Sequence, residues 1–484
     1  MQHFDYIVIG SGFSAFPAVQ RLINKKKKFA VIDIGQKIDK KLSNFYEKRS
    51  WKYIEKNKKE LTQKLDELQS NSSVKLSYGS NHSYYFSKKF NNELGSNFDQ
   101  YYSKSLGGFS NNWGGVLYLY NSKELKNWPI SKKKLYKDIN EICKMLQLDK
   151  KSISQLISFE KEILKKDQFY KDAVLALKNC KSRGMCMYGC PENNILNIKD
   201  LFKKLINKKK INYFPNLKLE KISQKKAIEL ECTNINNMKS NTFSAKKVFL
   251  AAGPVSTSDI IIKSFDEIEE LRIKDSTMFA FPIINLNKEK RKIGKQMCSK
   301  IFKYHKHNDN FLIQIYNDID FFLHKLPKFL RVFFNDFLKL SIGIGYLSSK
   351  DSPELVMKKK SNKDINYSSN KKSNLLKRIY FLSLFCIKNF SKGMVTLPFF
   401  QFKFKDFSSY HLGSSLPMSK KSTKTNKAFT DNLGRLNNNK NIIILDSSNF
   451  SDIQPGSISL MSAINSLRIT KSNIKSFRRF LIIC

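Results

Sequence analysis

The chain has 484 residues, of which 41% are hydrophobic, and it contains 38 Phe and 20 Tyr. These numbers exclude a disordered chain and are sufficient for two or three domains with a large core. No run of about 18 uncharged apolar residues occurs, and no charged and apolar leader precedes the first apolar run, so we expect a cytoplasmic protein without a spanning helix.

The formal net charge is +46, from 87 Lys and Arg against 41 Asp and Glu, and only 11 of the basic residues are Arg. Surfaces that bind phosphate groups usually use Arg as well as Lys, because the guanidinium group binds two oxygens at once. Abundant Lys, Asn, Ile and Phe are also typical of a genome rich in A and T. Two interpretations stay open: compositional drift, or a basic surface in weak contact with an anionic membrane such as the inner face of the cell membrane. Nucleic acid is not expected as a partner.

The N-terminal segment predicts a β-α-β unit. Asp5–Ile9 is a short apolar run typical of a buried strand, Phe16–Ile23 has the pattern of a helix, and Phe29–Asp33 is a second buried strand that ends in an acid. The unit spans about 30 residues, which is the expected size. The sequence therefore predicts an α/β fold that begins with a Rossmann-type unit.

The turn between this strand and helix carries the motif Gly10-x-Gly12-x-x-Ala15, with Ser14 inside it. Gly10 allows a tight turn, Gly12 lets the backbone approach a pyrophosphate, and the small Ala15 lets the helix pack on the strand. The N-terminus of the helix offers free N–H groups to phosphate. Asp33 can accept hydrogen bonds from ribose hydroxyls. The motif predicts a site for an ADP-containing dinucleotide, and a decayed site is the alternative.

A second glycine cluster, SLGGFSNNWGG at residues 105–115, surrounds Ser and Asn side chains with four glycines. Such a backbone can approach a flat, polar ligand closely. A glycine-rich surface turn is the alternative. Residues 131–178 then carry the pattern of two or three amphipathic helices.

A loop at residues 180–191 contains Cys180, Cys186 and Cys190, and the last of them is followed by Pro191. Iron–sulfur ligands can show such a Cys-Pro end. A tetrahedral zinc site would need a fourth ligand that the spacing does not offer. A plain structural loop, an iron–sulfur cluster and a redox-active thiol pair stay open, and we expect no metal.

The middle of the chain changes character at about residue 270. Before it, residues 248–252 (VFLAA) predict a buried strand that ends at Gly253. After it, strand-like pieces alternate with aromatic, Lys-rich helical pieces, and the polar tract 358–373 predicts a loop. The strand-like pieces are residues 311–316, 341–347 and 393–404. Residues 318–340 have apolar side chains at helical spacing, which fits either an interfacial helix or a helix that faces the core.

The last part of the chain returns to loops with glycine and serine. It contains His411, a predicted strand at residues 442–446 that ends in Asp446, and the turn Pro455-Gly456-Ser457 before a final helix. A structural role for His411, as a residue that holds this loop, stays open.

Together these segments resemble the glucose–methanol–choline (GMC) family of FAD-dependent oxidoreductases. The β-α-β unit, the GGFSNNWGG loop, the VFLAAGPVSTS segment at 248–258 and the tail from His411 to Arg468 occur in the family's order, over roughly half of the chain. The GGFSNNWGG loop, residues 78–85 (YGSNHSYY) and residues 127–131 (NWPIS) are most similar to the pyranose-oxidase branch and to bacterial relatives found among polysaccharide-biosynthesis genes.

The resemblance implies a discontinuous FAD-binding domain of residues 1–269 and 408–484, with a helical insertion at about 131–190. It implies an inserted α+β substrate domain at 270–407. The residues that would bind FAD are Gly10, Gly12, Ser14, Ala15 and Asp33 at the ADP part, Gly108, Ser110 and Asn112 along the flavin and ribityl chain, Ala252 and Gly253 at the adenosine side, and Asp446 at the ribityl chain or pyrophosphate.

The resemblance also implies a reaction: oxidation of a CH–OH group, with His411 as the base beside flavin N5. A sugar or a saccharide conjugate is the expected substrate, and the electron acceptor stays open. Two departures matter. Asn112 stands where the pyranose-oxidase branch has a His bonded to flavin, so FAD should be non-covalent. Ser457 stands where the family has a second His or Asn, and a hydroxyl can donate a hydrogen bond but cannot act as a base.

Two further functions remain open at this stage. Ser457 is compatible with a protein that binds flavin without oxidising an alcohol. The net charge and the aromatic tract at 318–340 are compatible with an accessory factor for polysaccharide synthesis at a membrane surface.

Overall fold

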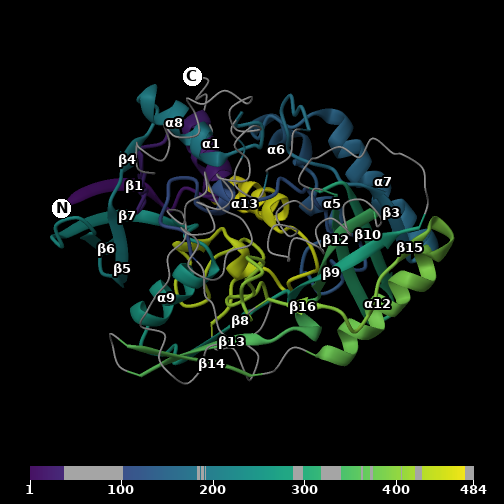
Figure 1. The fold of residues 1–484 in the computed structure, drawn as a ribbon. Helices are drawn as coiled ribbons and strands as arrows, with labels where there is room; N and C mark the ends of the chain where they lie inside the picture. The colour runs from purple at the N-terminus through teal and green to yellow at the C-terminus, as the bar shows by residue number, and fades with distance from the viewer. Residues whose placement is uncertain are drawn as a thin grey trace.

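The computed structural model describes residues 1–37, 102–182, 186, 190, 192–286, 298–317, 339–360, 364–370, 374–404, 406–419 and 428–474. Within these residues the strands form three sheets with helices between and around them, which is an α/β architecture (Figure 1). The segment 78–85, most of the aromatic tract 318–340 and parts of the cysteine loop lie outside the described residues.

The first sheet contains the predicted β-α-β unit. Strands β1 and β2 are parallel and are joined by helix α1, and β7 pairs in parallel with the other side of β1. The strand order is β4-β2-β1-β7-β6-β5, and β17 also pairs with β7. The bounds are β1 Gln2–Ile9, α1 Ala15–Asn24, β2 Phe29–Ile32, β4 Asn212–Phe214, β5 Leu217–Gln224, β6 Ile228–Asn234, β7 Ser240–Leu250 and β17 Ile442–Ile444. Because these central strands are parallel, the loops that follow β1, β2, β7 and β17 meet at one edge of the sheet.

The second sheet is antiparallel, in the order β15-β9-β12-β11-β10-β3, and β16 also pairs with β9. Its strands are β3 Gln168–Asp172, β9 Met278–Asn285, β10 Lys300–Lys306, β11 Asp309–Tyr316, β12 Lys339–Leu347, β15 Met394–Val395 and β16 Phe402–Lys403. Helix α12 (Leu375–Asn389) packs its Phe381 ring 4.2 Å from the ring of Phe311 in β11.

A third, three-stranded sheet has the order β14-β13-β8, with β8 Glu270–Lys274, β13 Glu354–Lys359 and β14 Ile365–Ser369. The predicted loop at 358–373 is therefore wrong, because its first part is the end of β13 and the strand β14. β14 carries polar side chains because it is an edge strand, and its residues are half-buried or exposed.

Two other sequence predictions need correction. The segment at 131–190 contains the helices α5 (Lys132–Leu135), α6 (Ile139–Met145) and α7 (Lys150–Lys166), but it also contains β3, which pairs with β10 of the second sheet. The helical insertion is therefore not wholly helical. The strand-like piece at 393–404 forms only the two-residue strands β15 and β16, because a tight turn joins Leu397 and Phe400 between them.

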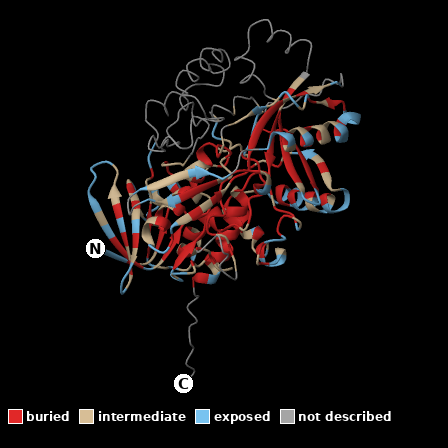
Figure 2. Ribbon diagram, turned by 90° about the horizontal axis from the view of Figure 1, so that it is seen from below, coloured by how far each residue is buried: buried red, intermediate tan, exposed pale blue. Residues whose placement is uncertain are grey.

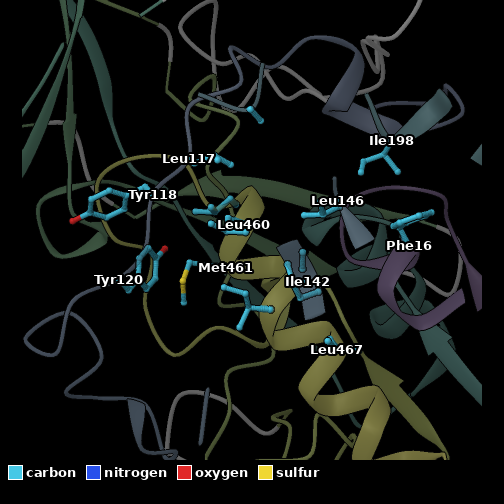
Figure 3. Packing of buried hydrophobic residues seen from close by; sticks show 14 of the residues in the cluster. Phe16, Leu117, Tyr118, Tyr120, Ile142, Leu146, Ile198, Leu460, Met461 and Leu467 are labelled. Carbon is cyan, nitrogen blue, oxygen red and sulfur yellow. The ribbon is translucent and has the colours of Figure 1, made fainter. Parts of the chain in front are cut away.

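The C-terminal helix α13 (Ser459–Asn473) lies at the centre of the molecule, between the first and the second sheet (Figure 1). Its apolar side chains, including Leu460, Met461 and Leu467, pack in one cluster with Phe16 of α1 and Ile142 of α6 (Figure 3). Buried residues concentrate in this central region, and exposed residues lie on the outer helices and strand ends (Figure 2). The C-terminal helix and the N-terminal β-α-β unit therefore share one hydrophobic core.

Candidate active site

A cavity of about 1090 Å³ lies where the loops after the first sheet face the second sheet. This volume slightly exceeds the roughly 300–1000 Å³ that is usual for drug-sized ligands, so the cavity can accept a larger molecule. Twelve of the thirteen predicted site residues line it: Gly10, Gly12, Ser14, Asp33, Gly108, Ser110, Asn112, Ala252, Gly253, His411, Asp446 and Ser457. Ala15 is the exception, since it is fully buried in the first turn of α1 beneath the glycine turn.

The two glycine loops face each other across one part of this cavity. Gly10 has a φ of 97°, and a Cβ there would lie 2.5 Å from the carbonyl oxygen of Ala251, so only glycine fits without a shift. At Gly12, a Cβ would meet no atom within 4 Å. A Cβ on Gly108 would lie 3.6 Å from the Cα of Gly12. The open space beside Gly12, next to the N-terminus of α1, leaves room for a pyrophosphate to approach the backbone.

Asp33 follows β2 and is held by protein donors. Its Oδ2 accepts hydrogen bonds from the hydroxyl groups of Ser11 and Tyr213, the latter at 3.3 Å. Burial raises the pKa of Asp33 to about 7, while those hydrogen bonds oppose the shift. Ser11 Oγ also accepts from the backbone N–H of Gly107 at 2.9 Å. Asp33 and Ser11 therefore fix the second glycine loop against the first.

Ser110 and Asp446 line the cavity but also support its wall. Ser110 Oγ lies 2.7 Å from the carbonyl oxygen of Gly107 and accepts from the N–H of Ile198 at 3.0 Å, which fixes the turn Gly108–Asn111 against helix α8 (Ile198–Asn207). Asp446 accepts from Gly253 N at 3.0 Å and from Thr257 Oγ1 at 2.6 Å. These bonds fix the residue before helix α9 (Pro254–Ser264) and the first turn of that helix, and burial raises the pKa of Asp446. Both side chains have a structural role in addition to their predicted contact with FAD.

His411 lies in the opposite wall of the cavity, where its ring centroid is 4.9 Å from that of Tyr346. Burial lowers its pKa to about 4, so the imidazole is neutral at pH 7. Its Nδ1 is buried, and no described protein atom hydrogen-bonds to it. A neutral imidazole in a cavity wall can accept a proton.

The loop that carries His411 is held by a short chain of hydrogen bonds. The N–H of His411 donates to Ser409 Oγ at 3.0 Å, and Ser409 Oγ donates to Asp275 Oδ1 at 2.5 Å. Burial raises the pKa of Asp275 to about 6. Two bulky residues in this loop, Phe407 and Tyr410, have left-handed φ angles of 64° and 61°. Such backbone is costly for side chains of this size and often occurs at functional sites.

The second sheet supplies four further side chains to the cavity. They are Met278 of β9, Gln314 and Tyr316 of β11, and Tyr346 of β12. The Tyr316 hydroxyl donates to Gln314 Oε1 at 2.7 Å. Pairing between distant segments brings these strands to the cavity. The sequence also gave no signal for Ser11, Tyr213 or Asp275.

None of the described residues of the cysteine loop lines this cavity. Where it is described, Cys190 Sγ accepts a hydrogen bond from Asn194 N at 3.3 Å. In the described part of the chain no three side chains of the types that ligate metals gather into one group. The absence of a metal and the function of the three cysteines stay predictions.

No family model and no curated protein sequence match this chain. Its fold does match a solved structure, that of pyridoxine 4-oxidase from Mesorbium loti. The TM-score is 0.62 at 11% identity, and the match covers 97% of this chain and 99% of that one. At this identity the likeness defines the fold alone, and at that level it agrees with the resemblance of the sequence to the GMC family. The pyranose-oxidase branch stays a prediction.

No helix among the described residues is both long and apolar enough to cross a membrane.

Proposed function

We propose that the chain is an FAD-dependent oxidoreductase that oxidises a CH–OH group with His411 as the base. The observation that carries the proposal is a shared cavity. Segments from both ends and the middle of the chain line it, and they bring the predicted FAD-binding residues together with His411 and Ser457. The shared fold with a solved oxidase supports the same class of reaction. A sugar or a saccharide conjugate is the proposed substrate, on the resemblance of the sequence.

In this proposal the backbone at Gly12 accommodates the pyrophosphate of FAD, Gly108 lies along the flavin and ribityl chain, and Asp33 meets the adenosine ribose. The free space beside Gly12 and the neighbouring N-terminus of α1 support this orientation. Asn112 lies in the cavity wall. An amide does not form the bond that a His makes to flavin, so FAD would be held non-covalently.

Bound FAD would supply the hydride acceptor. The part of the protein is to remove the hydroxyl proton, so that the oxidised carbon becomes a neutral carbonyl group. Because Nδ1 of His411 is buried, we propose that Nε2 is the atom that accepts the hydroxyl proton of the substrate. The hydrogen bonds from His411 N to Ser409 and from Ser409 to Asp275 keep the backbone that carries the imidazole in place. Ser457 would donate a hydrogen bond to the substrate oxygen.

The test is anaerobic stopped-flow bleaching of the flavin with a panel of sugars, nucleotide sugars and aromatic alcohols. A positioned base contributes roughly 10²–10⁴-fold, so His411→Ala should slow flavin reduction by about that factor and leave FAD bound. His3→Ala is the control, because His3 lies at the start of β1 and its side chain hydrogen-bonds only to Ser244 among the described residues. A His411→Ala variant that reduces flavin as fast as wild type would refute the role of His411.

A second candidate function is flavin binding without oxidation of an alcohol. The observation in its favour is Ser457, which occupies the cavity position where the family resemblance leads us to expect His or Asn. A yellow protein whose flavin is bleached by no member of the panel would support this candidate. Ser457→His would then be expected to create activity.

A further inference from the structure

We infer that the protein docks on an anionic lipid surface through a patch on α12 and the segment that follows it. Fourteen large hydrophobic side chains are exposed in the described chain, and nine of them fall between residues 375 and 402. We call these nine the 375–402 patch: Leu375, Leu376, Tyr380, Ile387, Phe390, Leu397, Phe399, Phe400 and Phe402. Several are strongly exposed, with Phe399 at 83% and Leu376 at 76%. An exposed apolar cluster of this kind marks an interaction site.

Helix α12 presents part of this patch as one stripe. Leu376, Tyr380 and Ile387 are spaced by four and seven residues, so they lie on one face of the helix. The opposite face contains Phe381 and Phe385, which are buried in the second sheet. The helix therefore has two apolar faces: one packs against the core, and the other is in contact with water. Figure 1 shows α12 at the outer edge of the molecule.

The segment after α12 runs back along the helix and adds the aromatic part of the patch. Thr396 N donates to Cys386 Sγ at 3.3 Å, and the Nε of Arg378 donates to Gln401 Oε1 at 2.7 Å. These two contacts hold residues 396–401 antiparallel to α12. Phe399 and Phe400 lie in a turn of this segment, and the two residues are 83% and 68% exposed.

The charge of this region selects an anionic lipid surface as the occupant. Between residues 375 and 403 the chain has five basic residues and no acid. Two of them, Lys377 and Lys403, pair with the carboxylates of Asp309 and Asp406, and Lys388 is exposed beside Ile387. The net charge of +46 adds a long-range attraction to any anionic surface. Exposed aromatic and aliphatic side chains with Lys beside them are typical of helices that lie in the membrane interface.

The patch also continues toward the cavity. Phe402 pairs with Ala280 in β9, and Met278, two residues away on that strand, lines the cavity wall near His411. Two residues of a strand span about 7 Å. Docking through the patch would therefore bring the cavity close to the lipid surface.

The experiment is co-sedimentation of the purified holoprotein with vesicles of phosphatidylcholine that contain phosphatidylglycerol, at moderate salt. Wild type should sediment with these vesicles and much less with pure phosphatidylcholine. Burial of one Phe side chain is worth about tenfold or more in affinity, so Phe399→Ser with Phe400→Ser should weaken the partition at least tenfold. The matched control is Ile157→Ser with Leu164→Ser, two exposed apolar residues of α7.

The melting temperature and flavin content of both double variants should equal those of wild type, because all four side chains are exposed. The inference is wrong if wild type stays in the supernatant, or if the Phe399 and Phe400 double variant binds vesicles as well as the α7 control. It is also wrong if light scattering finds a dimer that the patch variant abolishes while vesicles are not bound, because the patch would then cover a second copy of the chain.

Discussion

The ion pair of Lys303 and Glu124 allows a quantitative test of how the parts of the molecule are joined. Neither side chain has any exposed surface, and Lys303 Nζ lies 2.7 Å from Glu124 Oε1. Glu124 also accepts hydrogen bonds from the Tyr118 hydroxyl at 3.1 Å and from Asn121 N at 2.9 Å. Burial lowers the pKa of Lys303, and the carboxylate of Glu124 opposes that shift. Lys303 belongs to β10, so the pair joins the second sheet to the segment that follows the glycine loop.

This pair also supports the turn that contains Ser457. The side-chain amide of Gln454 donates to the backbone carbonyl of Glu124 at 3.2 Å, and Gln454 Oε1 accepts from Asn310 Nδ2 at 2.8 Å. Asn310 Oδ1 in turn accepts from Lys303 Nζ. Gln454 is three residues before Ser457, so loss of the pair should disturb the turn as well as the core.

The proposed change is Lys303→Met, which keeps the volume of the side chain and removes its charge. It leaves Glu124 buried with the hydrogen bonds of Tyr118 and Asn121 and a long one from Asn310 Nδ2 at 3.5 Å, but without its counter-charge. Breaking one side of a buried pair costs about 3–5 kcal/mol, so the free energy of unfolding should fall by about that amount. Adding Glu124→Gln removes the second charge, and the double variant should recover much of the loss, since paired charges are often replaceable by neutral groups.

The assay is chemical denaturation of the holoprotein, followed by fluorescence and by circular dichroism. Lys225→Met is the control, because Lys225 pairs with Glu229 on the surface and is 67% exposed; its denaturation midpoint should stay at the wild-type value. The reasoning fails if Lys303→Met is no less stable than this control. It also fails if the double variant is no more stable than Lys303→Met alone.

Three further predictions concern the cofactor. Gly12→Asp should still fold, because the added Cβ meets no protein atom within 4 Å, but it should lose FAD, because the carboxylate repels the pyrophosphate. Absorbance at 450 nm measures the flavin content, and an unchanged flavin content would contradict this prediction. Gly10→Ala should lose stability as well as FAD, since its Cβ would lie 2.5 Å from Ala251 O, and its thermal melting should separate it from Gly12→Asp. Acid precipitation should release all FAD from wild type, because Asn112 forms no bond to flavin, and flavin retained in the pellet would count against non-covalent binding.

The N-terminal unit could be predicted from sequence because its signals are local. The strand, the glycine turn and the next strand follow one another within 33 residues, and β1 and β2 differ from their predicted bounds by three residues or fewer. The predicted cavity residues Gly10, Gly12 and Asp33 belong to this unit. A turn that requires glycine is visible in the sequence, because the conformation constrains the residue type.

The second sheet could not be predicted to the same extent because its strands pair over long distances in the chain. β3 has the sequence QFYKD, with a single buried residue, Phe169, and it becomes a strand by pairing with residues 300–304. The partners of the site residues were missed for the same reason. Tyr213 meets Asp33 across 180 residues, and Asp275 meets Ser409 across 134. No local pattern encodes such contacts.

The pH dependence of flavin reduction is the sharpest expectation for His411. Burial lowers its pKa in the folded protein to about 4, below the value near 6.5 of an unfolded chain. The folded protein therefore binds fewer protons than the unfolded chain between these two values, and the histidine lowers stability as the pH falls through 6.5 toward 4. In the same range the folded protein keeps a neutral imidazole. His411 should therefore cause no decline in the rate of flavin reduction between about pH 8 and about pH 5, and its own decline should come only near pH 4. The carboxyl groups of Asp33, with a pKa of about 7, and Asp275, with a pKa of about 6, titrate within this range, so the profile is compared with those of Asp33→Asn and Asp275→Asn. A decline with an apparent pKa near 6.5 that both variants keep would place the base in solvent, and the buried imidazole of His411 would not be the group that accepts the proton.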